Sequence, residues 1–447
     1  AAEVAGGDRL VVIIGPAGAG KTSMLTAAID DLHAQGRPVF GIAPTAKAAR
    51  VLETETGIRA DTLAKLLHEH AREAGPRPEW RLKRGTTVIV DEAGMVSTPD
   101  LWRLTDLAQR LDLRVVLVGD PHQLQAVARG GMFPELAATA ARTVELEHVH
   151  RFTQDWEAAA SLRLRRGDPA ALSEYRWRGR IEAGSLDQHL NAIGDRWVEA
   201  QAKGRSLAIT TTTNEHATLI NHHIQNARLK AGALTGVPVA AADGDIYIGD
   251  VVMTRRNDRT ITTTAGDNVR NRDRWTITAT HDDGSITARA HMSDATVTLP
   301  AAYVREFVQL AYATTEHGNQ GITTDTSITL VTGTTTGRGL YVGATRGRDD
   351  NQFLVVTEQH SEREAMDLLG RVLATDRADT PAVTHRRQLA ERHPASAPGP
   401  RRRAVEPAWL SEWQNDVRDR VPMIGGLLAM MTEERPALEQ SVATARD

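Results

Sequence analysis

The chain has 447 residues, 41% hydrophobic and 25% charged, which is typical of a globular protein with more than one hydrophobic core. It has no cysteine, which excludes disulfides and thiolate metal sites and fits a reducing cytosol. The net charge of −4 excludes a uniformly basic protein, so any nucleic-acid surface must be local. Residues 1–8 lack the features of a signal peptide, and the apolar stretch 423–431 is far shorter than the roughly 20 residues that span a bilayer. We therefore expect a cytoplasmic protein without a membrane anchor.

The first part of the chain alternates short apolar runs with helical patterns. Residues 10–14 form a β-branched run that ends in glycine, and residues 23–35 place apolar side chains at helical spacing. Such alternation indicates βα units that build a parallel sheet, so we predict one α/β domain over residues 1–150. The further strands expected in it are residues 39–42, 87–90 and 115–118.

A second α/β series follows, and a stretch of different texture interrupts it. Residues 235–305 show short alternating runs separated by Gly249, Gly266 and an Asp-Gly turn, which indicates a small all-β insertion. The second α/β domain is therefore expected over residues 151–234 and 306–357. Its predicted elements are helices at 156–166 and 214–230 and strands at 206–211, 327–331 and 352–356.

The C-terminal region, residues 358–447, combines one helix with a tail. Residues 361–374 are amphipathic, and Ser361 and Glu364 have the spacing of a capping box at the helix start. Residues 375–407 are rich in Pro, Ala, Arg and His, so we interpret them as a linker with solvated arginines.

A glycine-rich loop lies between the first predicted strand and the first predicted helix, with the spacing Gly15-x4-Gly20-Lys21-Thr22. In this pattern backbone N–H groups turn toward phosphate oxygens, the lysine reaches the β and γ phosphates, and the threonine hydroxyl faces Mg²⁺. A chance glycine turn is the alternative. The position after a strand and before a helix favours a nucleotide site.

Two carboxylates, Asp91 and Glu92, come directly after the strand predicted at residues 87–90, where the edge of the sheet faces bound phosphates. We assign Asp91 to the metal ion, directly or through water, and Glu92 to polarising the water that attacks the γ phosphate. An Asp-Glu pair alone would more often decorate a helix start. Its pairing with the glycine-rich loop favours catalysis.

Three further polar residues are candidates for the same site. Gln123 follows the strand predicted at residues 115–118 and is a candidate sensor of the γ phosphate, although a Gly-Asp-Pro turn by itself indicates no more than a turn. Arg151 and Arg346 are candidates to stabilise charge on the transferred phosphoryl group, although a lone arginine is more often a surface ion-pair partner. The pair His148 and His150 has no third ligand nearby, so we interpret it as incidental rather than a metal site.

The order of these segments resembles the motif set of the superfamily 1 helicases, in the branch that holds RecD-like helicases and the helicase part of conjugative relaxases. The resemblance covers about residues 9–356, and several ordered matches are far more specific than any single one. The glycine-rich loop is similar to motif I, Asp91-Glu92-Ala93 to motif II, Gly119-Asp120-x-x-Gln123 to motif III, and Arg151 to motif IV. Residues 43–49, 312–321 and 342–348 are similar to the motif after motif I, to motif V and to motif VI.

The resemblance implies two RecA-like P-loop domains with parallel sheets and a small SH3-like β-barrel inserted in the second. It implies ATP and Mg²⁺ between the domains, single-stranded DNA across both, 5′ to 3′ movement, and a duplex with a 5′ tail as substrate. Thr315 and Gln320 would connect the DNA to the nucleotide. The nucleotide-binding residues that it implies are Gly15, Pro16, Ala17, Gly18, Ala19, Gly20, Lys21, Thr22, Ser23 and Gly321, with Thr22 and Asp91 at the metal. The DNA-binding residues that it implies are Thr45, Lys47, Thr62, Thr315 and His317.

Aromatic residues make up 4% of the chain, so extensive stacking of bases is not expected. Trp275 and Tyr312 are candidate platforms, although such residues more often belong to the core. Residues 1–9 contain no counterpart of the glutamine motif that reads adenine in this family, so preference for ATP rests on the resemblance. The segment 67–84, where relatives carry a strand-splitting pin, is short, which supports translocation better than duplex separation.

Several hypotheses about function stay open at this point. The favoured one is the helicase part of a conjugative relaxase, whose partners would be the conjugation machinery or a relaxase domain in the same polypeptide. The alternatives are a free-standing RecD-like repair helicase and a helicase-like module that binds single strands without hydrolysis. The presence of Lys21, Glu92 and Arg346 argues against the last. A P-loop switch or packaging ATPase would leave motifs IV to VI unexplained.

Overall fold

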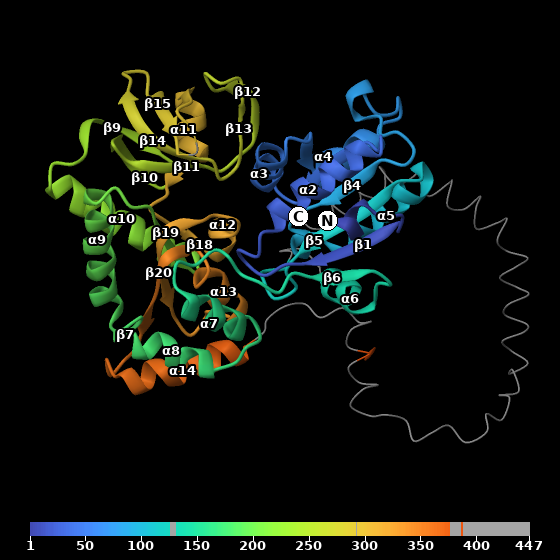
Figure 1. Ribbon diagram of the computed structural model, residues 1–447. Coiled ribbons are helices and arrows are strands. Elements are labelled where there is room, and N and C mark those ends of the chain that lie inside the picture. The colour runs from blue at the N-terminus through green and yellow to red at the C-terminus, as the bar shows by residue number, and fades with distance from the viewer. Residues whose placement is uncertain (126–130, 292, 376–385, 388–447) are drawn as a thin grey trace, which may run out of the picture. The chain divides into compact units, whose positions relative to one another are not determined.

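The computed structural model describes residues 1–125, 131–291, 293–375 and 386–387 (Figure 1). Its first sheet is six-stranded, and all its strand pairs are parallel. The β-branched runs form these strands, because a parallel sheet that is covered on both faces needs apolar side chains on both. The strand order is β3 (Ala60–Thr62), β2 (Val39–Ala43), β4 (Thr87–Val90), β5 (Arg114–Gly119), β1 (Leu10–Ile14) and β6 (Thr143–Glu145).

Two hydrophobic clusters cover the two faces of this first sheet. Neighbouring residues of β5 belong to different clusters, since Val115 packs in one and Val116 in the other, as the alternation of side chains in a strand requires. Leu104 fills the first cluster and Ile29 the second. The helices of this part are α1 (Ala2–Ala5), α2 (Lys21–Ala34), α3 (Ala46–Thr56), α4 (Leu63–His70), η1 (Pro78–Trp80), η2 (Ala93–Met95), α5 (Thr98–Leu111) and α6 (Met132–Thr139).

A second parallel sheet has five strands, in the order β18 (Ala313–Thr315), β8 (Leu207–Thr211), β19 (Thr324–Val331), β20 (Gly347–Val356) and β7 (Ile181–Gly184). β19 and β20 begin earlier than predicted. Pairing of polar residues, such as Thr326 with Asp350, extends them beyond their apolar cores. The accompanying helices are α7 (Asp155–Arg165), α8 (Ala170–Trp177), α9 (Leu186–Ala202), α10 (Asn214–Lys230), α12 (Glu316–Asn319), α13 (Gly337–Gly343) and α14 (Glu362–Ala374).

The insertion forms an antiparallel sheet that shares its core with the second parallel sheet. Val252 and Ile277 of the insertion lie in one hydrophobic cluster with Ile209 and Ile328 of that sheet. The antiparallel order is β16 (Thr296–Leu299), β15 (Ile286–Ala290), β14 (Arg274–Thr280), β11 (Val251–Thr254) and β17 (Val308–Leu310). The remaining elements are β9 (Thr235–Ala241) paired with β10 (Gly244–Ile248), β12 (Asp258–Thr262) paired with β13 (Asn268–Val269), and α11 (Ala301–Phe307).

The start of α14 departs from the predicted capping box. The Ser361 hydroxyl accepts a hydrogen bond from the backbone N–H of Glu364 at 3.2 Å, as predicted. The Glu364 carboxylate instead accepts from the backbone N–H groups of Glu358 and Gln359, at 2.9 Å each. His360 has a positive φ of 52°, which turns the preceding chain back over the helix start and brings those groups within reach.

The linker was predicted over residues 375–407. The structure describes only residues 375 and 386–387 of this range, so the prediction lies almost entirely outside the described residues. None of the helices in the described part of the chain is both long enough and apolar enough to span a lipid bilayer. The two parallel sheets and the insertion belong to one compact unit, Ala1–His385.

Candidate active site

The glycine-rich loop connects β1 to α2. Gly18 and Gly20 have φ values of 77° and 73°, a left-handed conformation that L side chains rarely adopt. Lys21 is the first residue of α2, and its Nζ donates hydrogen bonds to the carbonyl oxygens of Gly15 at 2.8 Å and Pro16 at 3.1 Å. The free N–H groups at the start of α2 give this loop the means to hold an anion.

The acid pair lies at the carboxyl end of β4, the strand predicted to precede it. Glu92 has a positive φ of 50°, a strained conformation for a residue with a side chain, and such strain gathers at functional sites. Its backbone N–H donates to Asp91 Oδ1 at 2.9 Å. Burial, followed by the negative charge of Glu92, raises the pKa of Asp91 to about 6 despite the opposing charge of Lys21. A buried carboxylate in that position is stabilised by a further cation.

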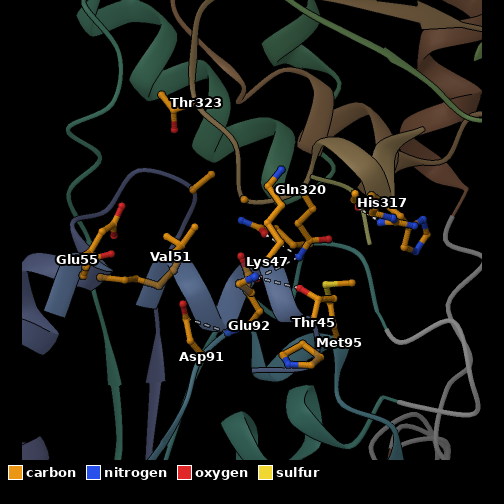
Figure 2. A pocket seen from close by; sticks show the side chains of 18 of the residues that line it. Thr45, Lys47, Val51, Glu55, Asp91, Glu92, Met95, His317, Gln320 and Thr323 are labelled. Atoms are coloured by element: carbon orange, nitrogen blue, oxygen red, sulfur yellow. Dashed lines mark hydrogen bonds between the residues drawn. The ribbon is translucent and has the colours of Figure 1, made fainter. Parts of the chain in front are cut away.

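Gln320 joins the two sheets at this site. It follows α12, and its Nε2 donates to Glu92 Oε2 at 3.0 Å and to Gln123 Oε1 at 3.4 Å. Gln123 follows β5 of the first sheet and is buried. The Oε1 atom of Gln320 is buried and accepts no hydrogen bond from the described residues. In Figure 2, Gln320 lies above Glu92 and points toward it.

The two predicted arginines come from separate segments and meet beside the glycine-rich loop. Arg346, between α13 and β20, is buried and donates to carbonyl oxygens of Val342 at 2.7 Å and Ile322 at 3.1 Å. Arg151 donates to the carbonyl of Thr345. Burial, followed by the positive charge of Arg151, lowers the pKa of Arg346 to about 9. Buried guanidinium groups that bond to neutral oxygens are well suited to an anionic ligand.

Arg151 also lies against the loop itself. A Cβ built on Gly18 would come within 2.3 Å of the Arg151 Cβ, which is impossible without movement. Glycine at this position therefore serves two needs, a left-handed turn and the close approach of Arg151.

These residues line a cavity of about 940 Å³. Most predicted site residues lie on its wall, whereas Gly15, Pro16 and Thr315 do not. Thr315 instead stands at the start of α12. The predicted residues that line the cavity are Ala17, Gly18, Ala19, Gly20, Lys21, Thr22, Ser23, Thr45, Lys47, Thr62, Asp91, Glu92, Gln123, Arg151, His317, Gln320, Gly321 and Arg346.

Two of the threonines predicted to bind DNA also cap helices. The Thr45 hydroxyl accepts from the N–H of Ala48 at the start of α3, and the Thr62 hydroxyl accepts from the N–H of Lys65 at the start of α4, at 3.2 Å in both cases. Replacing either threonine would therefore change helix stability, by about 1 kcal/mol, as well as any contact with a ligand.

The insertion adds two arginines that the motif analysis missed. Arg272 has a positive φ of 70° and donates to the carbonyl oxygen of His317 at 2.6 Å, and Arg274 donates to Asn319 Oδ1 at 3.4 Å. Lys47 lies close enough that burial, followed by the positive charge of Arg274, lowers its pKa to about 7. The alternating basic run at residues 270–274 was a visible signal, but only the fold brings it beside α12.

Ion pairs join the insertion to the first α/β part. Arg50 of α3 pairs with Asp267, and Arg259 of β12 lies 3.8 Å from Asp61. The first of these pairs holds α3, which carries Lys47, against the insertion, which carries Arg272 and Arg274. We call the basic group of these three residues the insertion cluster.

The candidate stacking platforms are core residues. Trp275 and Tyr312 are each 2% exposed, and the indole of Trp275 donates to Thr254 Oγ1 while the Tyr312 hydroxyl donates to Asp250. Neither ring is available to a base, so the favoured interpretation of these residues as core residues is confirmed. Both side chains fill the core shared by the insertion and the second sheet.

We assign no metal ion to the histidine pair His148 and His150. The rings of His148 and His150 stack with their centroids 6.4 Å apart. Within the described part of the chain, no group of three or more His, Cys, Asp or Glu side chains could hold a metal ion.

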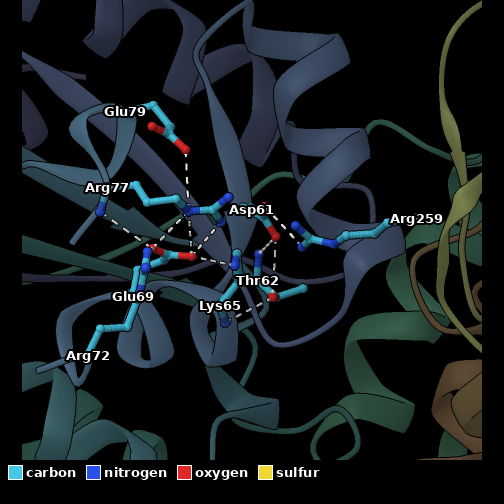
Figure 3. A network of polar contacts seen from close by, with 8 residues as sticks. All are labelled: Asp61, Thr62, Lys65, Glu69, Arg72, Arg77, Glu79 and Arg259. Carbon is cyan, nitrogen blue, oxygen red and sulfur yellow. Dashed lines mark hydrogen bonds and ion pairs between the residues drawn. The ribbon is translucent and has the colours of Figure 1, made fainter. Parts of the chain in front are cut away.

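An ion-pair network stabilises the short segment at the expected pin position, residues 67–84 (Figure 3). Glu69 of α4 accepts from Arg72 and Arg77 at 3.1 Å and also pairs with Lys65. Trp80 of η1 packs edge-on against Phe40, with ring centroids 5.8 Å apart. The segment is thus held to the first α/β part.

Comparisons with known families and structures agree with this architecture. The AAA domain family matches residues 1–186, and the Rv2311 SH3-like barrel domain family matches residues 239–309, which overlaps the predicted insertion. Pif1 helicase from Candida albicans aligns with 86% of this chain and 95% of its own, at a TM-score of 0.55 and 15% identity. Pif1 from Bacteroides, in complex with ADP-AlF3 and ssDNA, aligns with 87% and 94%, at a TM-score of 0.53 and 18% identity. The predicted fold class is confirmed, while the domain boundaries remain predictions.

Relatives by sequence narrow the assignment. The conjugal transfer protein TraA of Rhizobium radiobacter is 31% identical over 375 residues, which are 80% of this chain and 32% of that protein. The RecD subunit of the RecBCD enzyme of Mycolicibacterium smegmatis is 30% identical over 309 residues, or 58% of this chain and 54% of that protein. The chain spans about a third of the length of its TraA relatives. By fold and site it is a P-loop NTPase with two RecA-like domains and an SH3-like barrel. Within that class its sequence is similar to the RecD-like branch of the superfamily 1 helicases and to conjugal transfer proteins.

Proposed function

We propose that this chain hydrolyses ATP to move along single-stranded DNA and works as the helicase part of a conjugative relaxase. The observation that carries this proposal is the hydrogen bond of 3.0 Å from Gln320 to Glu92, because it joins the candidate catalytic acid on the first sheet to the segment of His317 on the second. A change at the nucleotide would thereby reach the candidate DNA surface through one side chain.

ATP with Mg²⁺ fits the residues present. Thr22 and Asp91 offer the oxygen ligands that Mg²⁺ prefers, and the raised pKa of Asp91 reflects a carboxylate that a cation would stabilise. When bound, Mg²⁺ would neutralise charge on the β and γ phosphates. The Oε1 of Gln320, which accepts no hydrogen bond from the described part of the chain, gives the cavity a further acceptor for a water or ligand group.

The residues of the two sheets divide the work of hydrolysis. In the first domain, Lys21 would bind the β and γ phosphates and Glu92 would orient a water and accept its proton. From the second domain, Arg346 and Arg151 would stabilise the charge that develops on the transferred group. Gln123, which is bonded to Gln320, would sense the γ phosphate.

Single-stranded DNA would lie along the insertion cluster. Lys47, Arg272 and His317 line the same cavity as the nucleotide residues, and the cations suit the phosphates of the strand, whose recognition requires no base contacts. The burial of Trp275 and Tyr312 favours phosphate contact over stacking at those positions. The Bacteroides Pif1 complex with ssDNA, which shares this fold, supports the assignment.

The proposed direction of movement along DNA and the proposed role in conjugation rest on similarity to known proteins. Resemblance to the RecD-like branch supports 5′ to 3′ movement on a duplex with a 5′ tail, in the cytoplasm. The match of 80% of this chain to TraA, a conjugal transfer protein, supports a partnership with a relaxase domain or the conjugation machinery. The RecD match covers less of this chain, so a free-standing repair helicase is the second candidate.

ATP hydrolysis with and without oligo-dT, followed by strand displacement on 5′-tailed and 3′-tailed duplexes, tests the proposal. We expect DNA-stimulated hydrolysis that is lost in Lys21→Ala and unwinding confined to the 5′ tail. DNA binding without hydrolysis would favour the non-hydrolysing module. Strand displacement on 3′-tailed duplexes alone would contradict the proposed 5′ to 3′ movement.

A further inference from the structure

A buried hydroxyl ties three segments together behind the nucleotide cavity. The phenol of Tyr341, on α13, accepts a hydrogen bond from the backbone N–H of Ala17 at 3.0 Å. The same hydroxyl donates to Asp120 Oδ2 at 3.1 Å. Ala17 belongs to the glycine-rich loop and Asp120 to the loop that carries Gln123, so one atom of the second domain holds both phosphate-facing loops of the first.

The surroundings fix this arrangement. Tyr341 and Asp120 are 2% and 3% exposed, and the methyl group of Ala17 packs in the same hydrophobic cluster as Tyr341. The other carboxylate oxygen of Asp120 accepts from Arg165 Nε of α7 at 3.0 Å. Arg165 in turn donates to Glu145 at 2.9 Å. Every polar atom of the Tyr341 and Asp120 side chains therefore has a partner.

A second contact of α13 strengthens the link to the Gln123 loop. Arg338 Nη1 donates to the backbone carbonyl oxygen of Gln123 at 2.8 Å and also to that of Pro121. Burial, followed by the negative charge of Asp120, raises the pKa of the Tyr341 phenol. The phenol thus stays protonated and remains able to donate to Asp120.

We infer that Tyr341 is a positioning residue for hydrolysis. Its hydroxyl fixes the part of the glycine-rich loop that contains Ala17 and the loop that carries Gln123 in their positions relative to Arg346. The inference rests on the proposed ATPase function. The N–H groups that would bind phosphate lie later in the loop, at the start of α2, so nucleotide binding does not depend on the Tyr341 hydroxyl. Alignment of Gln123 and Arg346 on the γ phosphate does depend on it, because Tyr341 lies on α13 and Arg346 follows the end of that helix after Ala344 and Thr345. Loss of the hydroxyl should lower kcat and leave the KM for ATP nearly unchanged.

The test compares Tyr341→Phe with Tyr175→Phe in the full chain. Tyr175 is a matched control, since it lies buried in the same hydrophobic cluster and its hydroxyl has no hydrogen-bond partner among the described residues. We expect Tyr341→Phe to lower the kcat of DNA-stimulated ATP hydrolysis about tenfold, with the KM for ATP within about twofold of wild type, and Tyr175→Phe to match wild type.

Amide hydrogen exchange supplies a second readout that does not require activity. In Tyr341→Phe, the peptide that carries Ala17 should exchange faster, while peptides of β19 and β20 should exchange as in wild type. An unchanged kcat, an equal fall in Tyr175→Phe, a change in KM alone, or unchanged exchange at Ala17 would overturn the inference. Absence of hydrolysis in the wild-type chain would instead refute the proposed function, and the exchange result would still decide whether the Tyr341 contact exists.

Discussion

The two walls of the cavity are built in different ways. On the first wall, Lys21 follows β1 after the glycine-rich loop and the acid pair follows directly after β4, so short stretches of sequence carry each group to its place. On the second wall, Arg151, Gln320 and Arg346 come from three segments that other helices and strands separate, and none of them directly follows a strand. The first wall is local in origin, and the second depends on the packing of the whole second domain.

Because of this difference, we expect the first wall to contribute mainly to nucleotide binding and the second wall mainly to the rate of hydrolysis. The first wall holds the loop and the helix start that suit phosphate, so it should bind nucleotide with its own groups. The second wall contributes buried cations that bond to carbonyl oxygens, which suits a charge that appears during reaction. Substitutions on the second wall should therefore reduce turnover more than nucleotide affinity.

The largest effect is expected for Arg346→Ala. Removing the guanidinium should lower the kcat of ATP hydrolysis by about 1000-fold, because an arginine that stabilises the transferred phosphoryl group contributes on this scale. Steady-state hydrolysis gives kcat, and binding of a fluorescent ATP analogue gives affinity, which should change by less than about fivefold. Arg371→Ala, in the last turn of α14, is the control for loss of an arginine and should match wild type. An equal loss of affinity and turnover would place Arg346 among the binding groups.

Glu92→Gln should lower kcat on the order of 100-fold, the usual scale for loss of a general base. Glutamine keeps an oxygen that can accept the hydrogen bond from Gln320, so the contact between the walls should persist. Single-turnover hydrolysis measures the chemical step directly. If Glu92→Gln turned over at the wild-type rate, the proton acceptor would have to be another group.

The insertion cluster should make DNA binding depend on pH. The pKa of Lys47 is lowered to about 7 by burial and by Arg274 and Arg272, with Asp273 opposing, so its ammonium group is charged below pH 7 and neutral above. A phosphate favours the charged form, so affinity for oligo-dT should fall by up to about tenfold between pH 6 and pH 8. Fluorescence anisotropy at constant ionic strength measures this. His317 lines the same cavity, and the variant Lys47→Met tells the two apart, because an unchanged pH slope in it would point away from Lys47.

The smallest effect is expected for Arg272→Ala. Loss of one phosphate contact should weaken oligo-dT binding about threefold and reduce the slope of log affinity against log salt by about 0.7. Arg289→Ala is the matched control, since Arg289 is exposed on β15 of the same insertion. A salt titration with both variants checks the prediction, and identical slopes would remove Arg272 from the DNA surface.

Much of the first wall could be predicted from sequence because its information is local. The alternation of apolar runs and helical patterns marked β1, α2 and β4, and the positions after them carried Lys21, Asp91 and Glu92. The helix Asn214–Lys230 was predicted to the residue for the same reason. Trp275 and Tyr312 were candidate platforms with the core as the favoured interpretation, and only the structure decided between the two, because composition does not reveal which rings a core will enclose.

By itself, the sequence determined the nucleotide loop, the acid pair and the two parallel sheets, since periodicity and glycine spacing act over a few residues. Tertiary structure alone decided that Gln320 meets Glu92, that Arg272 lies against His317, and that the Tyr341 hydroxyl holds Ala17 to Asp120. These contacts join residues more than 40 positions apart. They form because buried polar groups must find partners wherever the packed chain brings them together.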